Sequence, residues 1–281
     1  MTLAATPLSK HIGAEITGVD LSKPIDERTA KELHDLWLQY IVLLFRDQAL
    51  SQEDLLRASA VFGNVGNYAR PKQFRPAGFA DLKDEIMLIS NIRENGEAIG
   101  SLPDGEMMFH HDMLHAEIPH KGTCLYSVEV PSTGGNTLFA NGYAAYDSLP
   151  ADLKNALEGK KAFHHYNYGS TKKGDGKGVP AFGESRHPVF RTHEDTGRKA
   201  IYVNRLMTEQ VEGLPRDESV RLLGRLFDHA EKPEWTYEHV WRPGDLLVWD
   251  NRCSMHARTD FSPGERRLML RTTIKGDVRP Y

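Results

Sequence analysis

The sequence has little cysteine, no surplus of positive charge and no long hydrophobic run. Only Cys124 and Cys253 occur among 281 residues, which excludes a fold held together by a disulfide framework. Lys and Arg number 35 against 39 Asp and Glu, and this formal charge of −4 excludes a protein that coats nucleic acid, because such a protein needs a cationic surface. The longest apolar run, residues 41–45, is far too short to cross a bilayer and suits a buried strand.

Targeting signals and repeats are missing as well. The first residues show no basic segment followed by a long apolar stretch, so no signal peptide is expected, and the scarcity of cysteine agrees with a cytoplasmic location. No unit of 20–50 residues recurs, which excludes solenoids and propellers. Because no linker divides the chain, residues 1–281 are expected to form a single domain.

Helical patterns are confined to a few segments. Asp26 can cap a helix that ends near residue 39, and Ser51 begins a capping box for a second helix that runs towards residue 62. A late amphipathic helix is expected over residues 217–230. Its apolar residues at helical spacing are Val220, Leu223, Leu226 and Phe227.

From Gly122 onwards the pattern changes to short strands bounded by turns. About eight such strands with helices outside them predict a mainly β fold with helical insertions, a double-stranded β-helix of the jelly-roll or cupin type. Residues 64–108 are rich in Gly, Pro and polar groups and are expected to be a long, partly irregular excursion. The expected strands cover residues 123–130, 137–140, 188–192, 200–204, 237–241, 245–249 and 267–275.

Thirteen histidines are present, and a few of them stand two residues before a carboxylate. On an extended segment this spacing places both side chains on one face. With a distant histidine, such a pair forms the facial triad of non-haem Fe(II) oxygenases. His110 and Asp112 follow an apolar segment and are expected at the edge of a cavity, whereas His193 lies in a polar hairpin turn and is expected to be solvated.

The remaining histidines give weaker signals. His229 ends the late helix, where a cation complements the helix dipole, and His115 with Glu117 suits an edge-strand pair. His256 follows a strand and a polar turn, and is the candidate for the distant ligand. For His110 and His256 the alternative is a core histidine satisfied by hydrogen bonds.

The last predicted strand carries Arg267 and Arg271 on the same face. If that face lines a barrel mouth, two buried guanidinium groups need anionic partners. The alternative is an edge strand with its arginines in solvent. Two arginines directed at a His/Asp/His site would imply two acidic ligands, or one acid with two acidic ends.

Together these segments resemble the taurine / 2,4-dichlorophenoxyacetate dioxygenase family of Fe(II)- and 2-oxoglutarate-dependent enzymes, over about residues 7–280. The resemblance implies that His110, Asp112 and His256 bind Fe(II). It also implies that Thr137 and Arg267 hold the distal carboxylate of 2-oxoglutarate, and that Arg271 pairs with the acidic group of the substrate. The matching motifs include Phe109-His-His-Asp-Met113, Val130-Pro-Ser-Thr-Gly-Gly-Asn-Thr137, Asn141-Gly-Tyr-Ala-Ala-Tyr146, Trp249-Asp-Asn-Arg252 with His256, and Glu265-Arg-Arg-Leu-Met-Leu-Arg271.

An enzyme of this kind uses O2 to hydroxylate a small organic acid, of the carboxylate, sulfonate or phenoxyalkanoate class, and releases succinate and CO2. Family members are often dimers or tetramers, so the resemblance also implies a homo-oligomer. The segment before the site lacks the family's taurine-contacting residues. Met108 and Phe109 instead favour a larger apolar or aromatic acid. By strand alternation His111, between the two ligands, is expected to point away from the metal.

The sequence leaves two alternative functions and the role of one loop undecided. A Zn-dependent hydrolase could use the same ligands, although the sequence has no His-Glu-x-x-His helix. A non-catalytic jelly-roll module that binds a small acid would need Arg271 but no triad. Residues 169–178, rich in Gly and Lys, are either a lid over the substrate or an ordinary hairpin loop.

Overall fold

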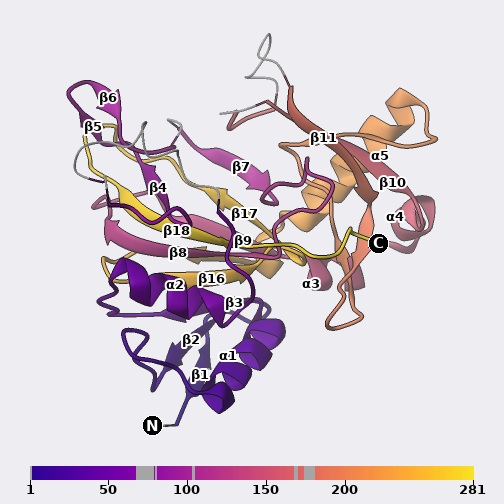
Figure 1. The fold of residues 1–281 in the computed structure, drawn as a ribbon. Coiled ribbons are helices and arrows are strands. Elements are labelled where there is room, and N and C mark those ends of the chain that lie inside the picture. The colour runs from indigo at the N-terminus through magenta and orange to yellow at the C-terminus, as the bar shows by residue number, and fades with distance from the viewer. Residues whose placement is uncertain (1, 68–78, 80, 103–104, 168–169, 174–180) are drawn as a thin grey trace.

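Two β-sheets stacked on each other form the centre of this computed structural model, which describes residues 2–67, 79, 81–102, 105–167, 170–173 and 181–281 (Figure 1). The major sheet has the strand order β1-β2-β3-β16-β8-β18-β4, and the minor sheet has the order β15-β9-β17-β7. This arrangement is the expected double-stranded β-helix. The major strands are β1 (Ala4–Pro7), β2 (Ala14–Thr17), β3 (Val42–Phe45), β4 (Met87–Ser90), β8 (Gly122–Glu129), β16 (Leu246–Asp250) and β18 (Leu268–Ile274). The minor strands are β7 (Met107–His110), β9 (Thr137–Asn141), β15 (Thr236–His239) and β17 (Ser254–Arg258).

The major sheet is buried on both faces, as alternation along β16 shows. Leu246 and Val248 pack in one cluster with the N-terminal helices, and Leu247 and Trp249 pack in another with Phe139 of the minor sheet. The same alternation sends Leu268 and Met269 of β18 into the two different clusters. Because β18 lies between β8 and β4, the alternative of a solvated edge strand is wrong.

The two N-terminal helices are confirmed. Helix α1 (Glu27–Tyr40) begins after Asp26, whose side chain accepts a hydrogen bond from the Thr29 backbone N–H. Helix α2 (Gln52–Ala60) begins with the expected capping box between Ser51 and Asp54. Both helices contact strands of the major sheet on the face away from the minor sheet (Figure 1).

A second layer of helices and strands lies beside the sandwich (Figure 1). The predicted late helix is α5 (Arg216–Ala230), and of its four apolar residues at helical spacing only Val220 is exposed, at 58%. The buried stripe instead includes Ser219, whose hydroxyl accepts a hydrogen bond from the Val211 backbone N–H. The other elements here are α3 (Gly142–Asp147), α4 (Ala151–Leu157), β10 (Lys161–Asn167), β11 (Ala181–Pro188), β12 (Phe190–Thr192), β13 (Lys199–Ile201), β14 (Thr208–Val211) and a 3-10 turn, η3 (Pro233–Trp235).

Three further expectations from the sequence can be compared with the structure. The excursion over residues 64–108 contains β4, a short hairpin of β5 (Arg93–Glu94) and β6 (Glu97–Ala98), and the first half of β7. Most of residues 169–178, for which a lid and an ordinary hairpin loop were the two alternatives, lie outside the described residues. Among the helices that are described, none has the length and apolar composition needed to cross a membrane.

Candidate metal centre

Neighbouring strands of the minor sheet bring the two predicted histidine ligands together. His110 at the end of β7 pairs in register with His256 of β17, and their ring centroids are 4.1 Å apart. Asp112 lies two residues beyond β7, and its Oδ1 is 3.9 Å from Nε2 of His110 and 3.8 Å from Nε2 of His256. All three side chains are buried, and their ligand atoms lie within 4.8 Å of one another, close enough to share one ion.

Hydrogen bonds leave the converging atoms available to a metal. Nδ1 of His110 is 2.9 Å from the Met108 carbonyl, so Nδ1 carries the proton and Nε2 presents its lone pair. Oδ2 of Asp112 accepts a hydrogen bond of 2.8 Å from Thr123 and pairs with Arg271 at 2.9 Å. Oδ1 of Asp112 therefore remains to face the two imidazoles.

The charge states also suit a metal. Burial lowers the pKa of His110 and places the pKa of His256 well below its ordinary value, so both rings are neutral. Burial would raise the pKa of Asp112, but Arg271 and the two imidazoles outweigh it and hold this pKa well below the usual range. Because metal ligands must be deprotonated, this set is ready to bind a divalent ion at neutral pH.

A second buried cluster of His193, Asp250 and Cys253 has similar spacing but a different environment. Asp250 accepts hydrogen bonds from Arg252 on both oxygens and one from His193 at 3.0 Å. Arg252 also binds Asp195 at 2.7 Å. His193 is only 1% exposed, so the expectation that it is solvated is wrong: the buried Asp250 carboxylate draws it inward.

Two weaker candidates differ from expectation. His229 is buried and bonded to the Ala145 carbonyl at 2.9 Å, and burial lowers its pKa, so it is neutral and not a cation at the helix end. His115 and Glu117 lie in a series of turns, not in an edge strand. Met113 opens these turns with a φ of 57°, which no extended strand allows. His111 is fully buried beside Asn204 and outside the ligand cluster, as expected.

Arg267 is a buried cation with no anionic partner among the described residues. Its exposed fraction is 2%, its Nε donates no hydrogen bond, and no carboxylate of the described residues forms an ion pair with it. Burial and the neighbouring Arg258 lower the pKa of Arg267 to about 9, which leaves it charged at neutral pH. A buried charge of this kind is costly unless a ligand pairs with it, so the site fits an anion.

The loop before β9 leaves room beside Arg267. Gly135 has a φ of 64°, and a Cβ there would lie 3.5 Å from Nε of Arg267. Gly134 approaches the Asp260 carbonyl so closely that a Cβ would lie 2.3 Å from its oxygen. Thr137 begins β9, and its hydroxyl oxygen accepts a hydrogen bond of 3.0 Å from Trp241, which leaves the hydroxyl proton to donate.

The predicted substrate residues lie around the same strands. Arg271 is half-buried in β18 and reaches Asp112. Met108 is partly buried against a small cluster that includes Leu114 and Tyr202. Phe109, on the alternate face of β7, packs against the cluster formed with α3 and α5.

Two residues that contact Asp112 were not predicted. Thr123 in β8 binds its Oδ2, and Asn251 binds its backbone. Asn251 lies in the Trp249–Arg252 motif, which could have drawn attention to it, whereas nothing near Thr123 in the sequence marks it.

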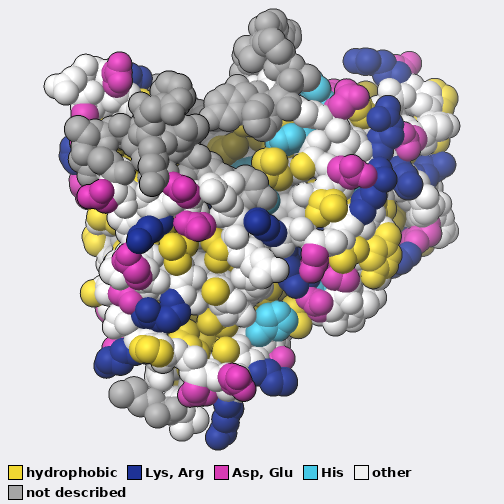
Figure 2. Space-filling view, viewed as in Figure 1, with side chains coloured by type: hydrophobic (Ala, Val, Ile, Leu, Met, Phe, Trp, Pro, Cys, Tyr) yellow, Lys and Arg dark blue, Asp and Glu magenta, His cyan; other side chains and the backbone are white. Residues whose placement is uncertain are grey.

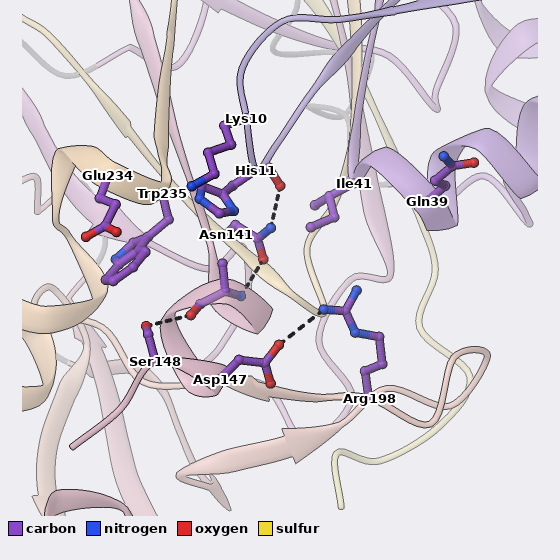
Figure 3. A pocket seen from close by; sticks show the side chains of 11 residues that line it. Lys10, His11, Gln39, Ile41, Asn141, Asp147, Ser148, Arg198, Glu234 and Trp235 are labelled. Carbon is purple, nitrogen blue, oxygen red and sulfur yellow. Dashed lines mark hydrogen bonds and ion pairs between the residues drawn. The ribbon is translucent and has the colours of Figure 1, made fainter. Parts of the chain in front are cut away.

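Figure 2 shows acidic and basic side chains interspersed over most of one face, with several Lys and Arg side chains gathered at the right of the view. A groove elsewhere on the surface is lined by Lys10, His11, Asn141, Asp147, Arg198 and Trp235 (Figure 3), among others. It contains none of the predicted site residues.

The fold and the buried His/Asp/His arrangement of this protein are those of the class of 2-oxoglutarate-dependent dioxygenases. The sequence model described as "Taurine catabolism dioxygenase TauD, TfdA family" matches residues 4–273, and the chain belongs to this family. It is therefore an oxidoreductase, and the hydrolase and the non-catalytic module are set aside.

Curated relatives and solved structures agree over nearly the full length. The chain is 32% identical to an (S)-phenoxypropionate/alpha-ketoglutarate-dioxygenase of Sphingobium herbicidovorans, over 96% of this chain and 94% of that protein. It is 35% identical to a pentalenolactone F synthase of Streptomyces avermitilis, over 92% and 89%. The structure of a putative alpha-ketoglutarate-dependent taurine dioxygenase from Burkholderia xenovorans matches with a TM-score of 0.82 at 32% identity, over 99% and 94%.

Proposed function

We propose that this dioxygenase binds Fe(II) through His110, Asp112 and His256 and hydroxylates a small organic acid, with release of succinate and CO2. The observation that carries the proposal is three buried, deprotonated ligand atoms that converge, while the Met108 carbonyl holds Nδ1 of His110 and Thr123 holds Oδ2 of Asp112. Bound iron would supply the oxidative chemistry with O2 and 2-oxoglutarate.

Arg267 and Thr137 are proposed to hold the distal carboxylate of 2-oxoglutarate. The support is the buried guanidinium of Arg267, which forms no ion pair with a carboxylate in the described part of the chain, together with the hydroxyl proton of Thr137. A guanidinium binds a carboxylate through two parallel hydrogen bonds, and a hydroxyl can satisfy a remaining lone pair.

The organic substrate is proposed to be an acid with an apolar or aromatic body. Arg271 lies 2.9 Å from the Asp112 carboxylate and so offers a cation beside the metal ligands. Met107 and Met108 provide apolar surface on β7, the strand that ends at His110. The names of the relatives include a phenoxypropionate dioxygenase and a synthase of pentalenolactone F. Because these names differ, they do not narrow the proposed substrate class, which remains carboxylates, sulfonates and phenoxyalkanoates.

The test is iron- and O2-dependent conversion of 2-oxoglutarate to succinate, measured with a panel of these acids. We expect one acid class to stimulate succinate release, and His110→Ala to reduce it to background. His34→Ala is the control that should keep activity, because α1 covers the face of the major sheet that points away from the minor sheet with its two histidine ligands. Full turnover in the His110→Ala variant would contradict the ligand assignment.

A further inference from the structure

Asn251 connects the two chain segments that carry the candidate metal ligands. It lies in the turn between β16 and β17, and β17 carries His256. The other segment runs from the end of β7 through Asp112 to His120. Asn251 is fully buried, so its polar atoms must be satisfied by the protein.

The Asn251 amide binds that second segment through three hydrogen bonds. Its Oδ1 accepts from the backbone N–H of Asp112 at 2.7 Å. Its Nδ2 donates to the backbone carbonyls of Asp112 at 2.9 Å and of His120 at 2.8 Å. One backbone N–H faces Oδ1 and two backbone carbonyls face Nδ2, and this pattern fixes the orientation of the amide and uses both of its N–H donors and its oxygen.

The backbone of Asp112 needs such support because no strand holds it. Asp112 lies beyond the last residue of β7, at the start of a series of turns. The next residue, Met113, has a φ of 57°, a conformation that costs a non-glycine residue energy and persists only where the surroundings enforce it.

The sequence neighbours of Asn251 form hydrogen bonds with residues outside the candidate metal site. Asp250 and Arg252 bind each other, and Asp250 also binds His193 while Arg252 binds Asp195, outside the metal site. Asn251 alone among these three has its side chain bonded to a ligand residue in the described chain.

We propose that Asn251 is a positioning residue that sets where Oδ1 of Asp112 lies relative to His110 and His256, and thereby the affinity and coordination geometry of the metal. The proposal rests on the proposed function, in which these three residues bind iron. It assigns to Asn251 a role beyond the stability of the turn, because its amide fixes the backbone from which a ligand extends.

The experiment compares Asn251→Ala with Asn141→Ala in the full-length protein. Asn141 is a matched control, since it is also buried and its side chain also makes three hydrogen bonds, to His11, Tyr143 and Ala144, of which the first is drawn in Figure 3. Each variant is titrated anaerobically with Fe(II) and with Co(II), and the visible spectrum of bound Co(II) reports coordination geometry. Melting temperatures of the metal-free proteins are recorded alongside.

We expect Asn251→Ala to weaken metal binding by about 10- to 100-fold and to change the Co(II) spectrum. Asn141→Ala should lower the melting temperature comparably while leaving affinity and spectrum as in the wild type. Wild-type affinity and spectrum in Asn251→Ala would overturn the positioning role alone, whereas absence of binding in the wild type would overturn the proposed function. If Asn251→Ala does not fold, Asn251→Ser against Asn141→Ser decides by the same criteria.

Discussion

Two buried groups of histidine and carboxylate lie in this molecule, and only one has the environment of a metal site. In the group around Asp250, both carboxylate oxygens accept hydrogen bonds from Arg252, and His193 adds another. In the group around Asp112, protein donors reach only Oδ2, and Oδ1 faces two neutral imidazoles. Both groups contain a buried histidine and aspartate, and in both the possible ligand atoms lie within 4.8 Å of one another, so what distinguishes a metal site here is the lone pairs that the protein leaves unsatisfied.

The largest expected effects come from removing the charge of each carboxylate in turn. Asp112→Asn should lose metal binding and turnover, because the ligand oxygen is lost. Asp250→Asn should keep metal binding but cost about 3–5 kcal/mol of unfolding free energy, because Arg252 loses its main buried partner. The measurement is the melting temperature with and without Co(II), since a ligand that binds only the folded state stabilises it.

The two variants are each other's control in this test. Added Co(II) should raise the melting temperature of the wild type and of Asp250→Asn, and leave Asp112→Asn unchanged. A Co(II)-dependent shift in Asp112→Asn of wild-type size would show that the ion binds elsewhere. Loss of the shift in Asp250→Asn would place the second group in the metal site.

The same contrast explains which features the sequence could predict. Helix starts at Asp26 and Ser51 depend on contacts within a few residues, and the sequence therefore predicts them. His110 and Asp112 stand out as candidate ligands in the sequence because their motif has a fixed spacing. His193 was misread because its partner Asp250 is 57 residues away, a contact that no local pattern records.

Contacts between residues on different strands are the features of the site that local sequence patterns do not predict. Thr123 binds Asp112 from β8, and Asn251 reaches it over a separation of 139 residues. Short elements such as α3 and α4, with six and seven residues, were missed for a different reason: their apolar stripes are too short to show a period. The contacts that position the candidate ligands are therefore tertiary contacts, although the candidate ligands themselves can be predicted from the sequence.

Arg267 and Arg252 extend the comparison to buried cations. Arg267→Met should raise the KM for 2-oxoglutarate by about 30-fold or more, since truncating one partner of a buried charge pair costs about 2–5 kcal/mol. Without 2-oxoglutarate the same change should raise the melting temperature, because it removes a buried charge with no carboxylate partner among the described residues.

Arg252→Met is the matched control, since this arginine is as buried but is paired with Asp250. It should lower the melting temperature. Unchanged KM in Arg267→Met would remove the proposed co-substrate role, and a lower melting temperature would mean that its guanidinium is paired within the protein.

His187 gives a pH test of a histidine that the protein itself satisfies. Burial lowers its pKa to about 4, and its Nε2 lies 2.8 Å from the Ala116 carbonyl, to which it donates. Since the folded pKa is below the unfolded value of 6.5, the unfolded chain binds more protons between these pH values, and stability is lost as the pH falls from 6.5 to 4. The contribution is on the order of 3 kcal/mol.

Urea unfolding of the wild type and of His187→Gln at pH 7 and pH 4.5 measures this contribution. The glutamine can keep the hydrogen bond to Ala116 but does not titrate, so the variant should lose less stability at the lower pH. An equal loss in both proteins would show that His187 titrates normally in the folded state.

The smallest expected effect concerns the donor that occupies the second oxygen of Asp112. Thr123→Val removes the hydroxyl but keeps the shape, and Arg271 still binds Oδ2. We expect metal affinity to fall by about tenfold, at the lower end of the range for partners of ligands. Thr272→Val in the adjacent strand is the control, because this buried threonine binds Ser59 instead of a ligand. If both variants weaken Co(II) binding equally, the effect comes from disturbance of the sheet; if only Thr123→Val does, the protein tunes the metal through the oxygen that the metal does not use.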